Sequence, residues 1–304
     1  MLLSLALVEY FVILLLIIFS VYHLTIIYRN KSFKAQWIDS SPLALLFLST
    51  SFMCLLAAIY TTQWILLACG AIRNVAENTT FLLYIGLLHI TFQLCYITAN
   101  LAIYAQRIYI LAFPLNSLAK ANKAIVLIEI VVSVVAVSVA TVPNVVGREA
   151  DTIPLPKDCY SNNCSNLLTR RTYSAGATFV LSVCTVILGG VLQYAHFKFR
   201  NSYKTAKSES VKLNQFARYS FYIRLSFETL PYMTDVILSN TVGLKVGPYL
   251  GPYGLLVISL DFCICTFLYH NMIIKKSGAV AQFRKRISGK QHKVADEPVD
   301  VTTL

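Results

Sequence analysis

Four acidic residues interrupt otherwise apolar stretches of the chain: Glu129, Glu228, Asp235 and Asp261. A carboxylate at membrane depth is costly, so it usually faces other protein groups and has a partner. Arg224 precedes Glu228 by four residues, which puts both side chains on one helix face and allows an ion pair. These residue types predict either a paired structural network or a conformational switch at Glu228, with Asp235 in a ligand pocket.

A second polar stripe comprises His89, Gln93, Tyr96 and Asn100, at spacings of four, three and four. Side chains at these spacings share one face of a helix, and in a membrane that face must meet protein or a wet cavity. We expect Asn100 to belong to the interior polar network. The other three lie in the outer part of the helix, so they are candidates for a small-molecule pocket or, alternatively, for hydrogen bonds between helices.

The sequence contains no nucleophile–base pair, phosphate-binding loop or metal-ligand spacing. No second ligand follows His89 at a helical spacing, which argues against zinc. We therefore predict no catalytic residue, no metal and no cofactor.

These side chains need a helical membrane scaffold to position them, and the composition indicates one. Hydrophobic residues make up 57% of the chain and charged residues 13%, against about 25% charged in soluble domains. A helical crossing needs about 20 mostly apolar residues. Seven runs reach that length: Leu3–Tyr28, Pro42–Ala68, Thr79–Gln106, Lys123–Val145, Tyr173–Phe197, Arg218–Asn240 and Pro248–Met272. We predict an all-α membrane protein, a seven-transmembrane helix bundle.

Basic residues set the predicted orientation, because lysine and arginine beside spans are retained on the cytoplasmic side. Most of the 26 basic residues fall in loops on one side of the seven runs and in the C-terminal tail. This places the N-terminus outside and the C-terminus in the cytoplasm. The net charge of +12 is thus a topology signal, and nucleic-acid binding is not expected.

The predicted organisation is a single transmembrane domain over residues 1–275 and a cytoplasmic tail over residues 276–304. Basic and apolar residues mix at 278–288, which predicts either a short amphipathic helix on the inner leaflet or a disordered basic segment. The polar remainder of the tail is expected to be disordered.

Three cysteines fall on the predicted outer side, where disulfides persist: Cys69, Cys159 and Cys164. One bridge can form, either from Cys69 to one of the other two or locally between Cys159 and Cys164. Asn78 and Asn163 match the glycosylation pattern on the same side. Asn163 is the better candidate because Asn78 lies close to the membrane.

Several motifs in order along the chain resemble a known receptor class. They are Gln106-Arg107-Ile108-Tyr109, Phe113-Pro114-Leu115, Thr229-Leu230-Pro231-Tyr232, Gly247-Pro248-Tyr249 through Gly254, and Ser259-Leu260-Asp261 leading to Leu268-Tyr269. With them the chain resembles rhodopsin-like G-protein-coupled receptors, and is most similar to nematode serpentine chemoreceptors of the Srbc class. The resemblance spans about residues 5 to 290.

The resemblance implies roles for individual residues. Arg107, followed by Tyr109, matches the arginine that opens the cytoplasmic G-protein cleft. Pro231 matches the sixth-helix proline, and Tyr269 matches the tyrosine that reorients near the inner end of helix seven. The ligand pocket would comprise His89, Gln93, Tyr96, Tyr232 and Asp235.

The chain also departs from the receptor pattern. Gln106 stands where many such receptors carry an acid, so the usual restraint on Arg107 is expected to be absent. Cys265-Thr266-Phe267-Leu268-Tyr269 replaces the usual Asn-Pro-x-x-Tyr. The second helix has no buried carboxylate, although Asp261 could serve that interior site, and Cys69 comes earlier than the usual cysteine. Without the family, an arginine at a helix end could simply extend to lipid phosphates.

The expected function is therefore a chemosensory receptor in the plasma membrane, by resemblance in a sensory cilium. Its partners would be the lipid bilayer, a heterotrimeric G protein and an odorant or pheromone. The sequence does not decide whether the chain forms a homodimer or a heterodimer. A ligand-gated channel and a small-solute or proton-coupled transporter are the alternatives. The predicted outer N-terminus argues against the channel, since insect odorant-receptor channels have theirs inside.

Overall fold

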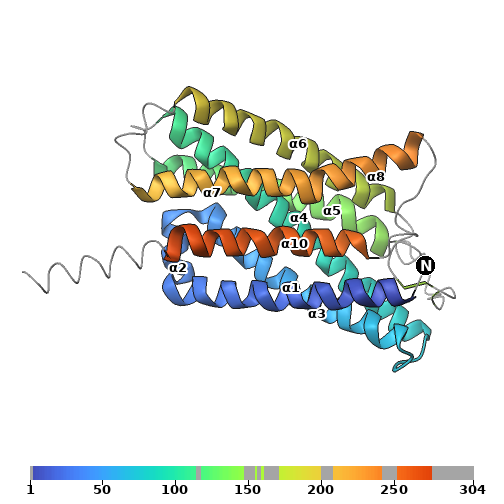
Figure 1. The fold of residues 1–304 in the computed structure, drawn as a ribbon. Helices are drawn as coiled ribbons and strands as arrows, with labels where there is room; N and C mark the ends of the chain where they lie inside the picture. Colours follow the sequence, from blue (N-terminus) through green and yellow to red (C-terminus); the bar gives the residue numbers. More distant parts are fainter. Residues whose placement is uncertain are drawn as a thin grey trace, which may run out of the picture.

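Long helices lying side by side form the whole fold of the computed structural model (Figure 1). The structure describes residues 3–113, 118–146, 155, 159–160, 171–199, 208–241 and 252–275. Within them run α1 (Leu3–Asn30), α2 (Phe33–Asp39), α3 (Ser41–Ala68), α4 (Ala76–Ala112), α5 (Leu118–Val145), α6 (Arg171–Lys198), α7 (Ser208–Arg224), η2 (Leu225–Thr229), α8 (Leu230–Thr241), α10 (Tyr253–Tyr269) and η3 (His270–Lys275).

Six of these helices are long and apolar enough to cross a membrane: α1, α3, α4, α5, α6 and α10 with the start of η3. This confirms six of the predicted spans as long apolar helices. The molecule is a multi-pass helical membrane protein.

The remaining predicted span, Arg218–Asn240, falls on α7, η2 and α8. These segments contain 17, 5 and 12 residues, and none of them is among the six candidate spans. The backbone stays right-handed helical at both junctions, with φ −62° and ψ −41° at Arg224 and φ −63° and ψ −48° at Leu230. A π-helical turn, not a loop, therefore joins α7 to α8.

The 37-residue helix α4 is the centre of the bundle and packs against α3, α5 and α6. Helix α1 packs against α10 and α3. Outward-facing apolar side chains cover the periphery: Leu15 on α1, Leu127 on α5 and Val180 on α6 are each more than half exposed. A soluble monomer rarely leaves such large apolar patches uncovered, whereas lipid chains would cover them.

Helix α2 is an element that the sequence did not predict. It occupies the short connection between α1 and α3, and the hydroxyl of Ser32 caps it by accepting from the amide of Ala35 at 3.4 Å. Gln36 is buried and donates to the carbonyl of Lys31 at 2.8 Å. Lys31 also forms an ion pair with Asp39, so the connection between α1 and α3 is held at both ends.

Helix α3 ends at a tight glycine turn. Gly70 has φ +72°, a left-handed conformation that favours glycine and commonly ends helices. Its amide donates to the carbonyl of Leu67 at 3.1 Å, and the amide of Ala71 donates to that of Leu66 at 2.9 Å. The neighbouring Cys69 is an exposed free thiol, so the bridge that would start at Cys69 is not formed.

Close packing of α6 on α7 depends on one glycine. A methyl group on Gly189 would overlap the ring of Phe221, whereas one on Gly190 would meet nothing within 4 Å. Phe221 is buried and stands edge-on to Tyr104 of α4, at 6.2 Å between ring centroids. It therefore has little room to move aside.

Gly189→Ala is accordingly expected to destabilise the protein by about 1–3 kcal/mol, the usual cost of an overpacked core. Gly190→Ala is the matched control and should leave stability unchanged or slightly raised, since alanine favours the helix. Thermal unfolding of the purified variants in detergent would measure both. Equal melting temperatures for the two variants would contradict this packing.

Candidate functional site

A fully buried arginine lies at the centre of the candidate site. Arg224, the last residue of α7, has none of its surface exposed. Its guanidinium pairs with Glu228, one turn further along in η2, and its Nη2 lies 3.8 Å from Oδ2 of Asp261 on α10. Burying charges costs several kcal/mol per ion unless partners compensate, so this pairing is what allows Arg224 to remain inside.

The aromatic ring of Tyr96 completes the surroundings of this arginine. The guanidinium carbon of Arg224 lies 4.5 Å from the centre of that ring, a favourable cation–π distance. Its Nη1 also donates to the backbone carbonyl of Tyr96 at 3.5 Å. Arg224 therefore joins α4, α7 and α10 through a single side chain.

Further hydrogen bonds extend this contact between the same helices. Ser220 donates to Oδ1 of Asn100 at 3.0 Å, and Asn100 donates to the carbonyl of Tyr96 at 2.9 Å. The thiol of Cys265 lies 3.7 Å from the Ser220 hydroxyl and 4.0 Å from Oδ1 of Asp261. We call this set the Arg224 network; its members are Tyr96, Asn100, Ser220, Arg224, Glu228, Asp261 and Cys265.

The π-helical turn η2 lies inside the network and just before Pro231. Proline lacks the amide that an α-helix would bond and crowds the carbonyl four residues earlier. A π-helical turn is one way in which a helix accommodates such a break, and such turns occur frequently at functional sites. The structure shows a π-helical turn at this place, and that turn carries Glu228.

Acidic groups outnumber basic groups within the network, because two carboxyl groups face one guanidinium. Oε1 of Glu228 and Oδ2 of Asp261 are buried and accept no hydrogen bond within the part of the chain that the structure describes. Glu129, on α5, is also buried, and its Oε2 likewise has no such partner there. Asn100, Glu228 and Asp261 all belong to the Arg224 network, whereas among the described residues no hydrogen bond or ion pair links Glu129 to them.

A second polar junction surrounds Gln106 near the end of α4. Its Oε1 accepts from the Ser40 hydroxyl at 2.7 Å and from Nη2 of Arg107 at 3.0 Å. Its Nε2 donates to Oδ1 of Asn122 on α5 at 2.8 Å. We call Ser40, Gln106, Arg107 and Asn122 the Gln106 junction.

The Gln106 junction gives Arg107 a hydrogen-bond partner. The residue before Arg107 is a glutamine and not an acid. Arg107 is buried and its guanidinium donates to the amide oxygen of Gln106. This neutral hydrogen bond is one contact that restrains the arginine.

The other residues with predicted activation roles take ordinary packing positions. Tyr269 is buried at the end of α10 between the rings of Phe47 and Phe216, with ring centroids 4.7 and 5.4 Å away. Tyr109 is partly buried and packs on Phe113 at 5.3 Å.

The structure distributes the predicted pocket residues over several places. His89 is buried on α4, Gln93 is partly buried one turn further, and Tyr96 belongs to the Arg224 network. The hydroxyl of Tyr232 donates to the carbonyl of Ala175 on α6 at 2.6 Å. The side chain of Asp235 lies outside the described residues.

Residues 155 and 159–160 pack onto the bundle at the end where the N-terminus lies (Figure 1). The side-chain amide of Asn74 makes two hydrogen bonds with the backbone of Leu155, at 2.8 and 2.9 Å. Tyr10 donates to the carbonyl of Tyr160 at 2.8 Å. Cys159 is buried and disulfide-bonded. These contacts hold residues 155 and 159–160 against α1 and the connection between α3 and α4.

The glycosylation and remaining disulfide candidates are only partly described. Asn78 lies in the first turn of α4 and donates to the carbonyl of Arg73 at 2.8 Å. Asn163 and Cys164, like the tail segment 278–288, lie outside the described residues.

Sequence reasoning missed the central position of Arg224 and the whole Gln106 junction. It treated Arg224 as a neighbour of Glu228 on one helix, because spacing reports only contacts within a helix. Ser220, Cys265 and Asn122 gave no signal, since small polar residues are common in membrane helices. The one available clue was an arginine next to an apolar run that also carries a glutamate.

Among the residues that the structure describes, no group of three or more histidine, cysteine, aspartate or glutamate side chains could hold a metal ion. The Nδ1 atoms of His23 and His270 lie 3.0 Å apart and join α1 to η3. This pair is a contact between helices.

No protein-family model matches this chain, and no curated protein matches it. Its class therefore rests on the sequence and the fold alone: the chain is a multi-pass helical membrane protein in which one buried arginine lies near two buried carboxyl groups.

Proposed function

We propose that the chain is a G-protein-coupled chemosensory receptor that binds an external odorant or pheromone and signals through a heterotrimeric G protein. The observation that carries this proposal is the Arg224 network, which holds α7, η2 and α10 against α4 through buried charges. Ionisable groups at membrane depth usually have a function. A network between helices is a site where a ligand could change the packing.

The proposal includes a seventh crossing made by α7, η2 and α8 together. Their continuous helical backbone, from Ser208 to Thr241, is long enough to span a bilayer. Figure 1 shows this helix running the length of the bundle beside α10 and α6. The apolar run Arg218–Asn240 supports the same assignment.

The proposed orientation places the N-terminus outside and the tail in the cytoplasm, in the plasma membrane and by resemblance in a sensory cilium. Figure 1 shows α2 and the start of α7 at one end of the bundle and the N-terminus at the other. The connections at the α2 end carry most of the lysines and arginines, which supports a cytoplasmic location for that end.

Signalling would follow from a shift between two packings of the same helices. A ligand among the outer halves of the helices, near His89, Gln93, Tyr232 and Asp235, would favour the packing to which it binds more tightly. The π-helical turn η2 is the flexible point, because its backbone hydrogen bonds are already irregular. Movement of α7 would break its contacts with α4. Arg107 would then release its hydrogen bond to Gln106 and contact the G protein instead.

The test is calcium and current recording in cells that express the full chain, challenged with pooled small metabolites. Each pool is applied with and without a co-expressed G-protein α subunit, and to Arg107→Ala. We expect responses that need the α subunit and that fall on the order of tenfold or more in the variant, within the range of ordinary coupling energies. Arg29→Ala is the matched control, because Arg29 is exposed near the end of α1.

A proton-coupled transporter is the second candidate. The observation that favours it is that Glu129, Glu228 and Asp261 each have a buried carboxyl oxygen that accepts no hydrogen bond from the described residues. Buried carboxylates of this kind serve as proton relays in carriers. A current or uptake that follows the pH gradient, survives without the α subunit and in Arg107→Ala, and disappears in Glu129→Gln would replace the receptor proposal with this one.

A further inference from the structure

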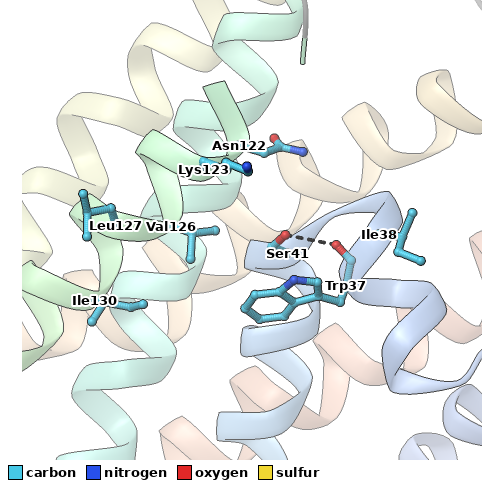
Figure 2. A pocket seen from close by; sticks show the side chains of 8 residues that line it. All are labelled: Trp37, Ile38, Ser41, Asn122, Lys123, Val126, Leu127 and Ile130. Carbon is cyan, nitrogen blue, oxygen red and sulfur yellow. Dashed lines mark hydrogen bonds between the residues drawn. The ribbon is translucent and has the colours of Figure 1, made fainter. Parts of the chain in front are cut away.

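A groove lies between the start of α3 and the first turns of α5, and no residue of the Arg224 network lines it (Figure 2). Its volume is about 440 Å³, and α2 supplies Trp37 and Ile38 to one wall. The opposite wall is α5, with Lys123, Leu127 and Ile130. No function proposed above uses this groove.

The groove lies where two apolar helices begin. The candidate spans Ser41–Ala68 and Lys120–Val145 both start at its rim. Residues at such a rim meet the boundary between lipid headgroups and hydrocarbon. Tryptophan is enriched at this depth, and Trp37 is partly exposed there.

The two ends of the groove differ in chemistry. Lys123 is exposed at the polar end, and among the described residues no carboxylate pairs with it. Next to it, Oδ1 of Asn122 accepts a hydrogen bond from Gln106. The amide nitrogen of Asn122 remains able to donate to another group. Lys120 lies three residues before Lys123 on the same helix face and adds a second exposed cation.

The other end is aliphatic and open to the side. Val126, Leu127 and Ile130 follow Lys123 at spacings of three, four and seven, so they form one continuous stripe along α5. Leu127 is 63% exposed and Ile38 70% exposed. An occupant could therefore enter from the bilayer without crossing the bundle.

We propose that this groove binds an anionic phospholipid from the leaflet at the basic end of the bundle. The phosphate would lie against Lys123 and Asn122, and the upper part of an acyl chain would follow Leu127 and Ile130. A cation above an aliphatic stripe matches an anionic headgroup above its hydrocarbon chain. A water-soluble anion would gain nothing from the stripe, and a neutral lipid would gain nothing from the lysine.

The bound lipid would also contact the Gln106 junction. Asn122 forms part of the groove and accepts a hydrogen bond from Gln106, whose oxygen holds Arg107. A phosphate that draws Asn122 toward it would weaken one of the contacts that position Gln106. Lipid composition would then influence the restraint on Arg107.

Photo-cross-linking of the purified full chain would test lipid binding directly. The protein is placed in phosphatidylcholine nanodiscs that contain a photoactivatable phosphatidylserine, and labelled peptides are mapped by mass spectrometry. We expect labelling within residues 123–130. Lys123→Gln should reduce it roughly fivefold, the usual effect of one lysine at an anionic surface. Lys34→Gln, an equal charge change on an exposed lysine of α2 outside the groove, should leave it unchanged.

Leu127→Trp tests the aliphatic part. It would fill the groove and reduce labelling, whereas Ile128→Trp should not, because Ile128 is equally exposed, at 62%, but does not line the groove. Equal labelling by a phosphatidylcholine probe, stronger labelling by a sterol probe, or no difference between the paired variants would overturn the proposal. The assay contains no ligand and no G protein, so its failure would leave the receptor proposal untouched.

Discussion

Arg224→Met is expected to lower the free energy of unfolding by about 3–5 kcal/mol, the usual cost of removing one partner from a buried ion pair. Methionine keeps most of the length of the side chain, so the loss comes from charge and not from a cavity. Glu228 and Asp261 would then face each other inside the bundle without a cation. Tyr96 would also lose the guanidinium over its ring.

Thermal unfolding of the purified chain in detergent, followed through its tryptophan fluorescence, measures this effect. Arg218→Met is the matched control. Arg218 is on the same helix but only partly buried, and it donates to Gln193 at 2.9 Å. We expect it to cost about 1 kcal/mol or less, as removal of a partly exposed polar contact usually does.

A triple variant, Arg224→Met with Glu228→Gln and Asp261→Asn, separates charge from packing. Replacing a buried ionic cluster by neutral groups is often nearly neutral for stability. The triple variant should therefore be more stable than Arg224→Met, and it keeps the prediction testable where the single variant fails to express. Wild-type stability in Arg224→Met, or a triple variant less stable than the single one, would contradict the buried charge network.

Gln106→Leu is expected to have the second largest effect. The change removes hydrogen bonds to Ser40, Arg107 and Asn122 at once. Each bond contributes about 1 kcal/mol net, and buried groups left without a partner cost more, so the loss should be about 2–4 kcal/mol. If the receptor proposal is correct, Arg107 would also lose its restraint, and signalling without ligand should rise severalfold.

Two readouts distinguish these consequences of Gln106→Leu. Thermal unfolding reports the lost hydrogen bonds, and basal G-protein activation, normalised to surface expression, reports the freed arginine. Gln63→Leu is the control, because Gln63 is a partly buried glutamine on α3 outside both polar clusters and outside the proposed ligand pocket. Unchanged stability would count against the junction, whereas lower stability without a rise in basal signalling would count against the coupling role of Arg107.

The fold was predictable where the apolar length alone decides the structure. Helices α1, α3, α5 and α6 follow their apolar runs closely, since a run of about 20 such residues has few alternatives to a helix in a membrane. Helix α2 was not predicted, because its seven residues lie in a polar connection and it depends on the cap at Ser32. The π-helical turn before Pro231 was not predicted either.

The candidate site was predictable only in part, because pairing within a helix follows from spacing whereas pairing between helices follows from packing. Arg224 and Glu228 could be paired from their separation of four residues. The approach of Asp261 and Tyr96 to the same guanidinium depends on how α10 and α4 pack against α7. Whether Cys69 forms a disulfide could not be decided from the sequence for the same reason. In the structure Cys69 is a free thiol at the end of α3.

The π-helical turn in residues 225–229 has a consequence for the length of this segment. A π turn contains about one residue more than an α turn, so deleting one residue here could restore a regular α-helix. The deletion would leave the facing of α8 relative to α7 nearly unchanged, because a π turn completes one revolution with about one residue more than an α turn does. Tyr232 would then keep its acceptor on α6, and Arg224 would keep its place on α7. The π-helical turn thus accommodates one extra residue without changing how the two flanking helices face the bundle.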